Sequence, residues 1–255
     1  MSTAMIDPVS HDTNNTGRSP ARVPMDSLRK TALVAGVLYV ITFISIPTLV
    51  LYGPVLSDPN YIVGPAPDTP VIIGGILEVI VALAGVGTAV VLYPVVKRQN
   101  EAAALGFVGS RTLEGAAIVA GVVSLLSLVT LRQAGAGAGA LATGQALAAS
   151  YNWFFLLGQS LMPVVNALLL GSLLYRSRLV PRILPLVGLI GAPILLASDI
   201  AVLFGLWDRI SAPSGLLALP IALWEFSLGV YLIVKGFKPS PITAGMTAIN
   251  KQPTL

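Results

Sequence analysis

The sequence predicts an all-α, polytopic membrane protein, a bundle of six transmembrane helices with both termini cytoplasmic. Of its 255 residues, 55% are hydrophobic and only 10% are charged, whereas a soluble domain carries about 25% charged residues. Apolar stretches long enough to cross a hydrocarbon layer of roughly 30 Å, at about 1.5 Å per residue, recur along the chain. The net charge of +4 comes from basic residues at the ends of these stretches, which indicates contact with anionic lipid rather than with nucleic acid.

The clearest span covers 151–174. It begins with the aromatic cluster YNWFF, whose tyrosine and tryptophan favour the membrane interface, and it is followed by Arg176, Arg178 and Arg182. Because Lys and Arg residues beside a span tend to stay in the cytoplasm, these three arginines determine the expected orientation of the helix.

Five further spans follow from the same criteria, over 32–52, 71–96, 113–131, 183–206 and 216–234. A single six-helix domain is therefore expected over 28–238, between a disordered cytoplasmic tail at 1–27 and a flexible cytoplasmic tail at 239–255.

Two connections on the external side have distinct compositions. Residues 53–70 are rich in proline and predict an ordered loop, and the Gly/Ala-rich residues 132–150 predict a flexible linker. With this topology, Arg132 and Arg209 are the basic residues that fall outside, and the other Lys and Arg residues fall on the cytoplasmic side.

The reactive residue types are few. The chain has no cysteine and a single histidine, His11, in the polar N-terminal tail. Disulfides, thiolate catalysis and histidine-ligated metal in the spans are thereby excluded. We assign no catalytic residue, no metal site and no cofactor, and the sequence favours a protein that is not an enzyme.

Several stretches resemble a family of uncharacterised membrane proteins, domain of unknown function 4386. They are RKTALVAGVLYVITFISIP (29–47), ILEVIVALAGVGTAVVLYPVVKRQNE (76–101), FLLGQSLMPVVNALLLGSLLYRSRLVPR (155–182) and WEFSLGVYLIVKGF (224–237). The resemblance extends over nearly all of 29–238. It implies a multi-span membrane protein and supplies no activity.

Five polar residues inside the spans form the candidate site: Glu78, Asp199, Glu225, Gln159 and Asn166. Counted from the external ends of the spans, the first four lie roughly 10 to 14 Å deep, which predicts one polar layer in the outer half of the membrane. We expect no basic residue within the spans, so at least one of the three carboxyl groups should be protonated at neutral pH.

Arg111 and Glu114 have a different expected role. They are three residues apart at the predicted cytoplasmic start of the span 113–131. This spacing, together with the helix N-terminus, predicts a local structural ion pair.

Three functions fit these features. The first is a permease-like protein whose outer polar cavity takes an ion, a proton or a small polar solute. The second is a structural or regulatory subunit whose buried polar residues only hold helices together. The third is an intramembrane hydrolase. The expected partners are the lipid bilayer of the cell membrane and a small solute or cation, with the oligomeric state left open.

Overall fold

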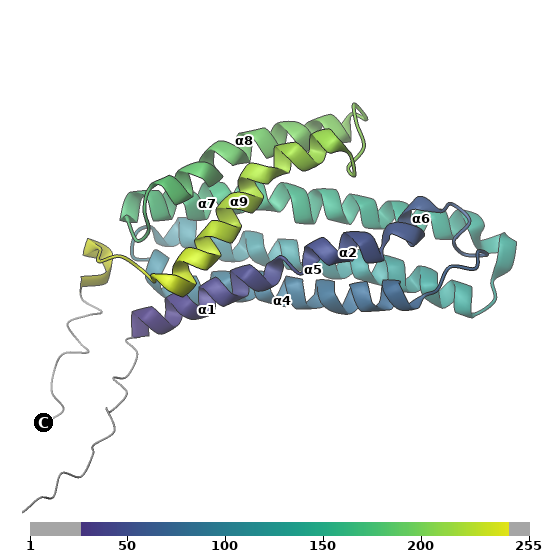
Figure 1. The fold of residues 1–255 in the computed structure, drawn as a ribbon, viewed down its shortest axis with the longest axis horizontal. Helices are drawn as coiled ribbons and strands as arrows, with labels where there is room; N and C mark the ends of the chain where they lie inside the picture. The colour runs from purple at the N-terminus through teal and green to yellow at the C-terminus, as the bar shows by residue number, and fades with distance from the viewer. Residues whose placement is uncertain (1–26, 245–255) are drawn as a thin grey trace, which may run out of the picture.

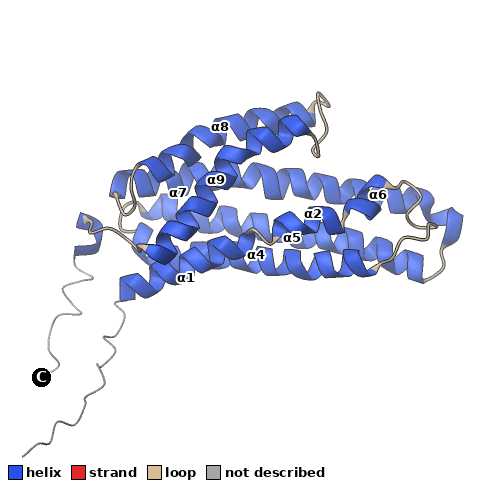
Figure 2. Ribbon diagram, viewed as in Figure 1, coloured by secondary structure: helices blue, strands red, loops and turns tan. Residues whose placement is uncertain are grey.

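The computed structural model describes residues 27–244, which form helices and connecting loops without a strand (Figures 1 and 2). Residues 1–26 and 245–255, which contain most of the two predicted tails, lie outside the described residues. The α-helices are α1 (Ser27–Thr42), α2 (Ser45–Leu51), α3 (Gly53–Ser57), α4 (Thr69–Val96), α5 (Glu101–Gln133), α6 (Leu141–Phe154), α7 (Leu161–Ser177), α8 (Ile183–Leu203) and α9 (Ala212–Val234). Shorter elements are the 3-10 helices η1 (Gly137–Ala140) and η3 (Pro241–Thr243) and the π-helix η2 (Phe155–Ser160).

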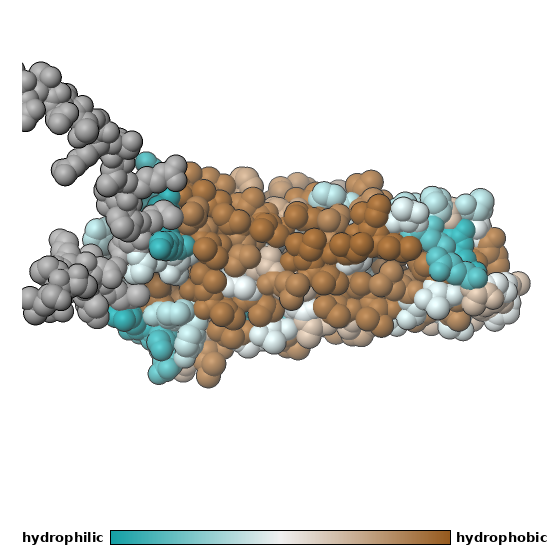
Figure 3. Space-filling view, turned by 90° about the horizontal axis from the view of Figure 1, so that it is seen from below, coloured by the Kyte–Doolittle hydropathy of each residue, from teal (hydrophilic) through white to brown (hydrophobic). Residues whose placement is uncertain are grey.

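Six helical stretches in the described part of the chain are long and apolar enough to cross a membrane, as the sequence predicted. They are α1 with α2, α4, α5, the run from η1 through α7, α8 and α9. On the face drawn in Figure 3, hydrophobic residues cover a broad central band and hydrophilic residues gather toward its two ends. The protein is therefore a multi-pass, all-helical membrane protein.

The six spans form a ring in the order of the sequence. α1 contacts α4, α4 contacts α5, α5 contacts α7, α7 contacts α8, α8 contacts α9, and α9 returns to α1. Figure 1 shows α9 crossing the bundle obliquely between α8 and α1. Side chains from helices far apart in the sequence therefore meet inside the ring.

The contact that closes the ring depends on two glycines. A Cβ added at Gly36 of α1 would lie 2.6 Å from the backbone oxygen of Gly229 on α9, so only a residue without a side chain fits. Tyr39 lies about one helical turn after Gly36, and Glu225 lies about one turn before Gly229. Each side chain therefore projects from the same face of its helix as the neighbouring glycine. The close approach of the backbones therefore brings both side chains into the interior.

The third span differs from the expectation. Its helix, α5, starts at Glu101 rather than at residue 113, because the Asn100 side chain caps it by accepting a hydrogen bond from the Ala103 N–H at 2.9 Å. Arg111 thus lies about 15 Å along the helix from its start. The expectation that no basic residue lies within a span was wrong.

The predicted flexible linker at 132–150 was also wrong. Residues from 137 onward form η1 and α6, since alanine has the highest helix propensity of all residues. Gly144 packs on Ile62 of the loop between α3 and α4, where a Cβ added at Gly144 would lie 3.3 Å from the Ile62 side chain. Arg132 pairs with Asp68 of the same loop at 2.9 Å, and the connection over 132–150 is therefore packed.

The packed part of the chain extends past residue 238, where the sequence placed the start of a tail. The Lys238 N–H donates to the Leu179 carbonyl at 2.7 Å, and the Ser240 hydroxyl donates to the Ser177 carbonyl at 2.6 Å. These bonds hold residues up to η3 against the turn between α7 and α8.

Two spans are interrupted, each next to a proline. α1 and α2 are separated by a turn at Phe43, whose carbonyl accepts from the Ile46 N–H at 3.1 Å because Pro47 has no N–H to offer. In the fourth span, η2 widens the helix just before Pro163, which cannot donate to the carbonyl of Gln159. Both interruptions leave irregular backbone inside the bundle.

Candidate functional site

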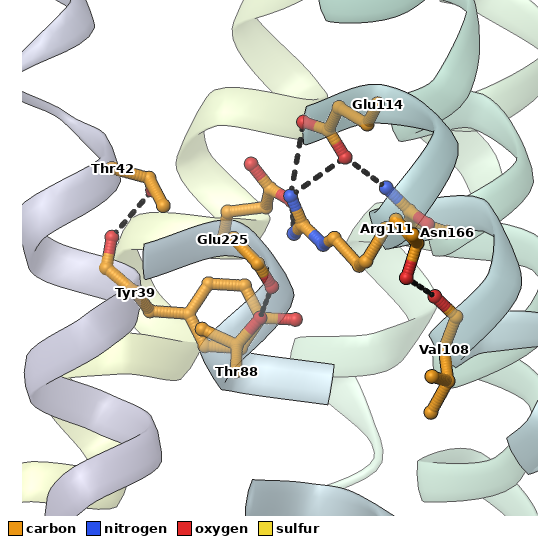
Figure 4. A network of polar contacts seen from close by, with 10 residues as sticks. Tyr39, Thr42, Thr88, Val108, Arg111, Glu114, Asn166 and Glu225 are labelled. Atoms are coloured by element: carbon orange, nitrogen blue, oxygen red, sulfur yellow. Dashed lines mark hydrogen bonds and ion pairs between the residues drawn. The ribbon is translucent and has the colours of Figure 1, made fainter. Parts of the chain in front are cut away.

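Arg111 lies at the centre of a buried polar group that we call the Arg111 cluster, made of Arg111, Glu114, Asn166 and Glu225 (Figure 4). One nitrogen of the guanidinium, Nη1, is 3.0 Å from Glu114 Oε2, and the other, Nη2, contacts Glu225 Oε1. The Asn166 amide donates to Glu114 Oε2 at 2.7 Å. Three spans, α5, α7 and α9, are thereby connected through one arginine.

The Arg111 cluster is shielded from solvent. The exposed fraction of the side chain is 2% for Arg111, 11% for Glu114 and 13% for Glu225. The ring of Tyr39 lies over the guanidinium, with its centroid 5.4 Å away. With both carboxyl groups ionised, two negative charges face one positive charge in a region of low dielectric constant. The cluster can therefore attract a further proton or cation.

A cavity of about 240 Å³ adjoins the Arg111 cluster and is lined by Arg111, Glu114 and Glu225. Its wall also includes both helix interruptions, with Phe43 from the first and Gln159 from the second. This volume is sufficient for several water molecules or a small solute.

Glu78 lies in a second group, on α4. Its Oε1 accepts hydrogen bonds from the Tyr151 hydroxyl at 3.1 Å, from the Thr48 hydroxyl at 3.4 Å and from the Gln159 amide at 3.4 Å. The residue is 0% exposed, and Oε2 has no hydrogen-bond partner among the described residues. Glu78 does not line the cavity beside Arg111, but Gln159 contacts both.

Asp199 lies in a third group, on α8. It accepts a hydrogen bond from the Ser160 hydroxyl at 2.6 Å, and it is 3% exposed. It lines another cavity, of about 470 Å³, whose wall also includes Arg209 from the loop between α8 and α9. Ser160 lines both cavities, so the two adjoin at η2.

The predicted site residues therefore fall into three neighbouring groups. Glu225 lies deeper than expected, about 20 Å from the start of α9, because the helix begins at Ala212 rather than at 216. The structure brings Glu225 to Arg111 and Asn166 to Glu114, and Glu78 and Asp199 have other partners.

The predicted ion pair between Arg111 and Glu114 is present, but inside the bundle rather than at a helix start. Arg176, Arg178 and Arg182 lie at the end of α7 and in the turn to α8. Residues 27–244 contain no group of three or more His, Cys, Asp and Glu side chains placed to hold a metal ion.

Sequence reasoning missed Ser160, which bonds to Asp199 and lines both cavities, and Tyr151, which donates to Glu78. Their signal was indirect, because neither is charged and Ser160 gains its position from the π-helix before Pro163. Gln159 and Ser160 are neighbours on that π-helix, and they contact Glu78 and Asp199 respectively. A π-helix inside an α-helix often marks a functional site.

Comparison with known proteins gives a family. Residues 34–236 match the family described as Domain of unknown function (DUF4386). No curated protein and no solved structure matches the chain. Because the match covers most of the sequence, this membrane protein belongs to the DUF4386 family.

Proposed function

We propose that the protein is permease-like and binds a small cation or a proton in the cavity beside the Arg111 cluster. The observation that carries this proposal is a cavity of about 240 Å³ whose wall includes Arg111, Glu114 and Glu225. Two carboxyl groups share one guanidinium there, so a bound cation or proton would neutralise the excess negative charge. Neutralisation is strongly favoured where the dielectric constant is low.

The interrupted helices support the same function. Membrane transporters bind ions and solutes near the middle of the bilayer, where discontinuous helices expose backbone groups to a cavity. Here the turn at Phe43 and the π-helix η2 both line the cavity. Irregular backbone at these two places would also let the spans shift relative to one another.

The orientation and the membrane belong to the proposal. Lys97 and Arg98 lie at the end of α4, and Arg176 and Arg178 lie at the end of α7. By the positive-inside tendency this end of the bundle faces the cytoplasm, with both termini on that side of the cell membrane.

Purified protein in detergent provides the test. Thermal unfolding is measured in sodium, potassium or calcium chloride and in choline chloride at equal ionic strength, between about pH 5 and pH 8. A ligand that binds only the folded state raises the unfolding temperature. We expect at least one small cation, or a fall in pH, to stabilise the natural protein, and we expect Glu225→Gln to lose that response.

Glu101→Gln is the matched control, because Glu101 is an exposed carboxylate at the start of α5, away from the cavity. It should keep the response of the natural protein. Proteoliposomes with an entrapped pH-sensitive dye then test whether binding is accompanied by proton movement. A natural protein that responds to none of these cations and to no pH change would overturn the proposal.

The alternative is a structural or regulatory subunit, and one observation favours it. Arg111 and Glu114 bond to each other and to Glu225 on α9 and Asn166 on α7, as expected of polar groups that hold helices together. In that case Glu225→Gln should lower stability by the same amount in every salt.

A further inference from the structure

The cavity of about 470 Å³ that contains Asp199 has not been assigned a role. It lies between α2, η2, α8 and the start of α9, and its wall includes Asp199 and Arg209. It is distinct from the cavity beside the Arg111 cluster, although Ser160 lines both. What this cavity binds is therefore independent of the proposed function.

The two charged residues of this cavity leave polar atoms unused. Asp199 is 3% exposed, and while one carboxylate oxygen accepts from Ser160, Oδ2 has no partner among the described residues. Arg209 Nε is likewise buried without a partner. An unpaired buried polar atom costs free energy, and for a charged group the cost is larger. Both residues would therefore gain from a ligand.

Asp199 and Arg209 do not neutralise each other, because no ion pair joins them in the described range 27–244. Arg209 is held by other contacts. Its Nη2 donates to Asn152 Oδ1 at 2.8 Å, and its guanidinium lies over the ring of Phe155, 4.1 Å from the centroid. Burial lowers the pKa of Arg209, yet a guanidinium stays protonated in proteins. One fixed positive charge and one buried carboxylate thus share a cavity without pairing.

The remaining wall combines hydroxyl groups with apolar surface. Ser160, Ser198, Ser211 and Ser214 contribute hydroxyl groups, which can accept or donate further hydrogen bonds. Leucine and valine side chains of α2 and α8 supply the apolar part. A ligand that fits this cavity should have a small polar end that carries a positive group for Asp199 and a negative group for Arg209.

We propose that this cavity binds a zwitterion whose primary ammonium donates to Asp199 and whose phosphate or carboxylate accepts from Arg209. A primary ammonium has three N–H donors for Asp199 Oδ2 and the neighbouring hydroxyls, and a guanidinium binds phosphate or carboxylate through several N–H groups. Two sources share this chemistry: the headgroup of phosphatidylethanolamine, and a free zwitterion such as phosphoethanolamine or an amino acid.

Native mass spectrometry and thermal unfolding of the purified, delipidated protein test the proposal. The probes are phosphatidylethanolamine, phosphatidylcholine, phosphatidylglycerol, phosphoethanolamine and glycine. Phosphatidylcholine keeps the phosphate and the positive charge but has no N–H, and phosphatidylglycerol has no cation. We expect a probe with a primary ammonium to bind at least tenfold more tightly than either of these two lipids, as for a lost charge-assisted hydrogen bond.

Variants then locate the site. Asp199→Asn and Arg209→Gln should each weaken binding about tenfold or more. Asp208→Asn and Arg98→Gln change exposed charges outside this cavity and should bind as the natural protein does. Since the comparison among probes uses the natural protein alone, it decides the question even where a variant fails to fold.

Preference for phosphatidylethanolamine would support the proposal and identify a lipid headgroup as the ligand. Preference for phosphoethanolamine or glycine, with the same dependence on Asp199 and Arg209, would support it and identify a free zwitterion. Equal binding of all five probes, binding that is unchanged in both variants, or no binding of any probe would overturn it.

Discussion

Arg111 on α5 and Glu225 on α9 form an ion pair across 114 positions of the chain. Glu114 holds the other guanidinium nitrogen, so the arginine connects two carboxyl groups inside the bundle. In hydrocarbon such charges persist only when they are paired or hydrated. The relationship between these residues therefore determines both how stable the interior is and what it can bind.

Replacing Arg111 with glutamine should lower the free energy of unfolding by about 3 kcal/mol, because it leaves two buried carboxyl groups without their cation. Glu225→Gln should cost less, about 1 kcal/mol, since Glu114 still pairs with Arg111. Chemical denaturation of the purified protein in detergent, followed by circular dichroism, measures both losses.

Arg98→Gln serves as the control for this comparison, because Arg98 is exposed just after α4 and its loss should change stability by less than about 0.5 kcal/mol. Equal losses for the buried and the exposed arginine would mean that the Arg111 cluster contributes nothing to the fold.

Water access to the cavity can be measured with single thiols, because the natural sequence has no cysteine. Ser160→Cys and Ala222→Cys each place a thiol in the wall of the cavity beside the Arg111 cluster. Leu223→Cys places one on the outer surface, where the Leu223 side chain is 61% exposed. We expect a positively charged methanethiosulfonate reagent to modify the two cavity thiols, and the lipid-facing thiol to react slowly.

The charge of the reagent is informative as well. A net negative charge in the cavity should make the positively charged reagent react at least tenfold faster than a negatively charged one of similar size, since interaction energies of a few kcal/mol are expected at these short distances. The opposite preference, or no reaction at either cavity position, would exclude a hydrated cation site.

The six spans could be predicted from the sequence because apolar length is a strong signal, whereas Arg111 was misplaced. The α5 helix begins about three turns before its most apolar part. Only the cap at Asn100 and the alanines that follow signal this start. Depth counts based on hydropathy alone therefore put the arginine at the membrane surface.

The grouping of polar residues could not be predicted for a related reason. Positions on a single helix follow its periodicity, and the face with Gly74, Glu78 and Ala82 is buried as that periodicity predicts. Which faces meet depends on the order of helices around the ring and on the π-helix η2, which changes the direction of Gln159 and Ser160. Neither is encoded in the spacing of polar residues.

The orientation of the protein is a separate prediction. Asn60→Cys places an exposed thiol in the loop between α3 and α4, and Arg98→Cys places one just after the other end of α4. A membrane-impermeant maleimide added to intact cells should label the thiol at position 60 and should reach position 98 only after permeabilisation. Labelling of position 98 in intact cells would reverse the proposed topology.

The contact between η2 and α5 can be tested through Gly158. A Cβ added at Gly158 would lie 2.3 Å from the Cβ of Ala117, a distance that requires backbone movement. Gly158→Ala should therefore lower the free energy of unfolding by about 1 to 3 kcal/mol. Adding Ala117→Gly removes the opposing methyl group and should recover most of that loss, less the roughly 1 kcal/mol that glycine costs within a helix.

Gly109→Ala is the matched control for this prediction, because Gly109 lies within α5 and nothing comes within 4 Å of a Cβ added there. Since alanine favours the helix, this variant should be neutral or up to about 1 kcal/mol more stable than the natural protein. Opposite signs for the two glycine substitutions would show that close packing, and not helix propensity, requires glycine at position 158. If Gly158→Ala were as stable as Gly109→Ala, η2 would not be held against α5, and the position of Gln159 and Ser160 between the two cavities would lose its support.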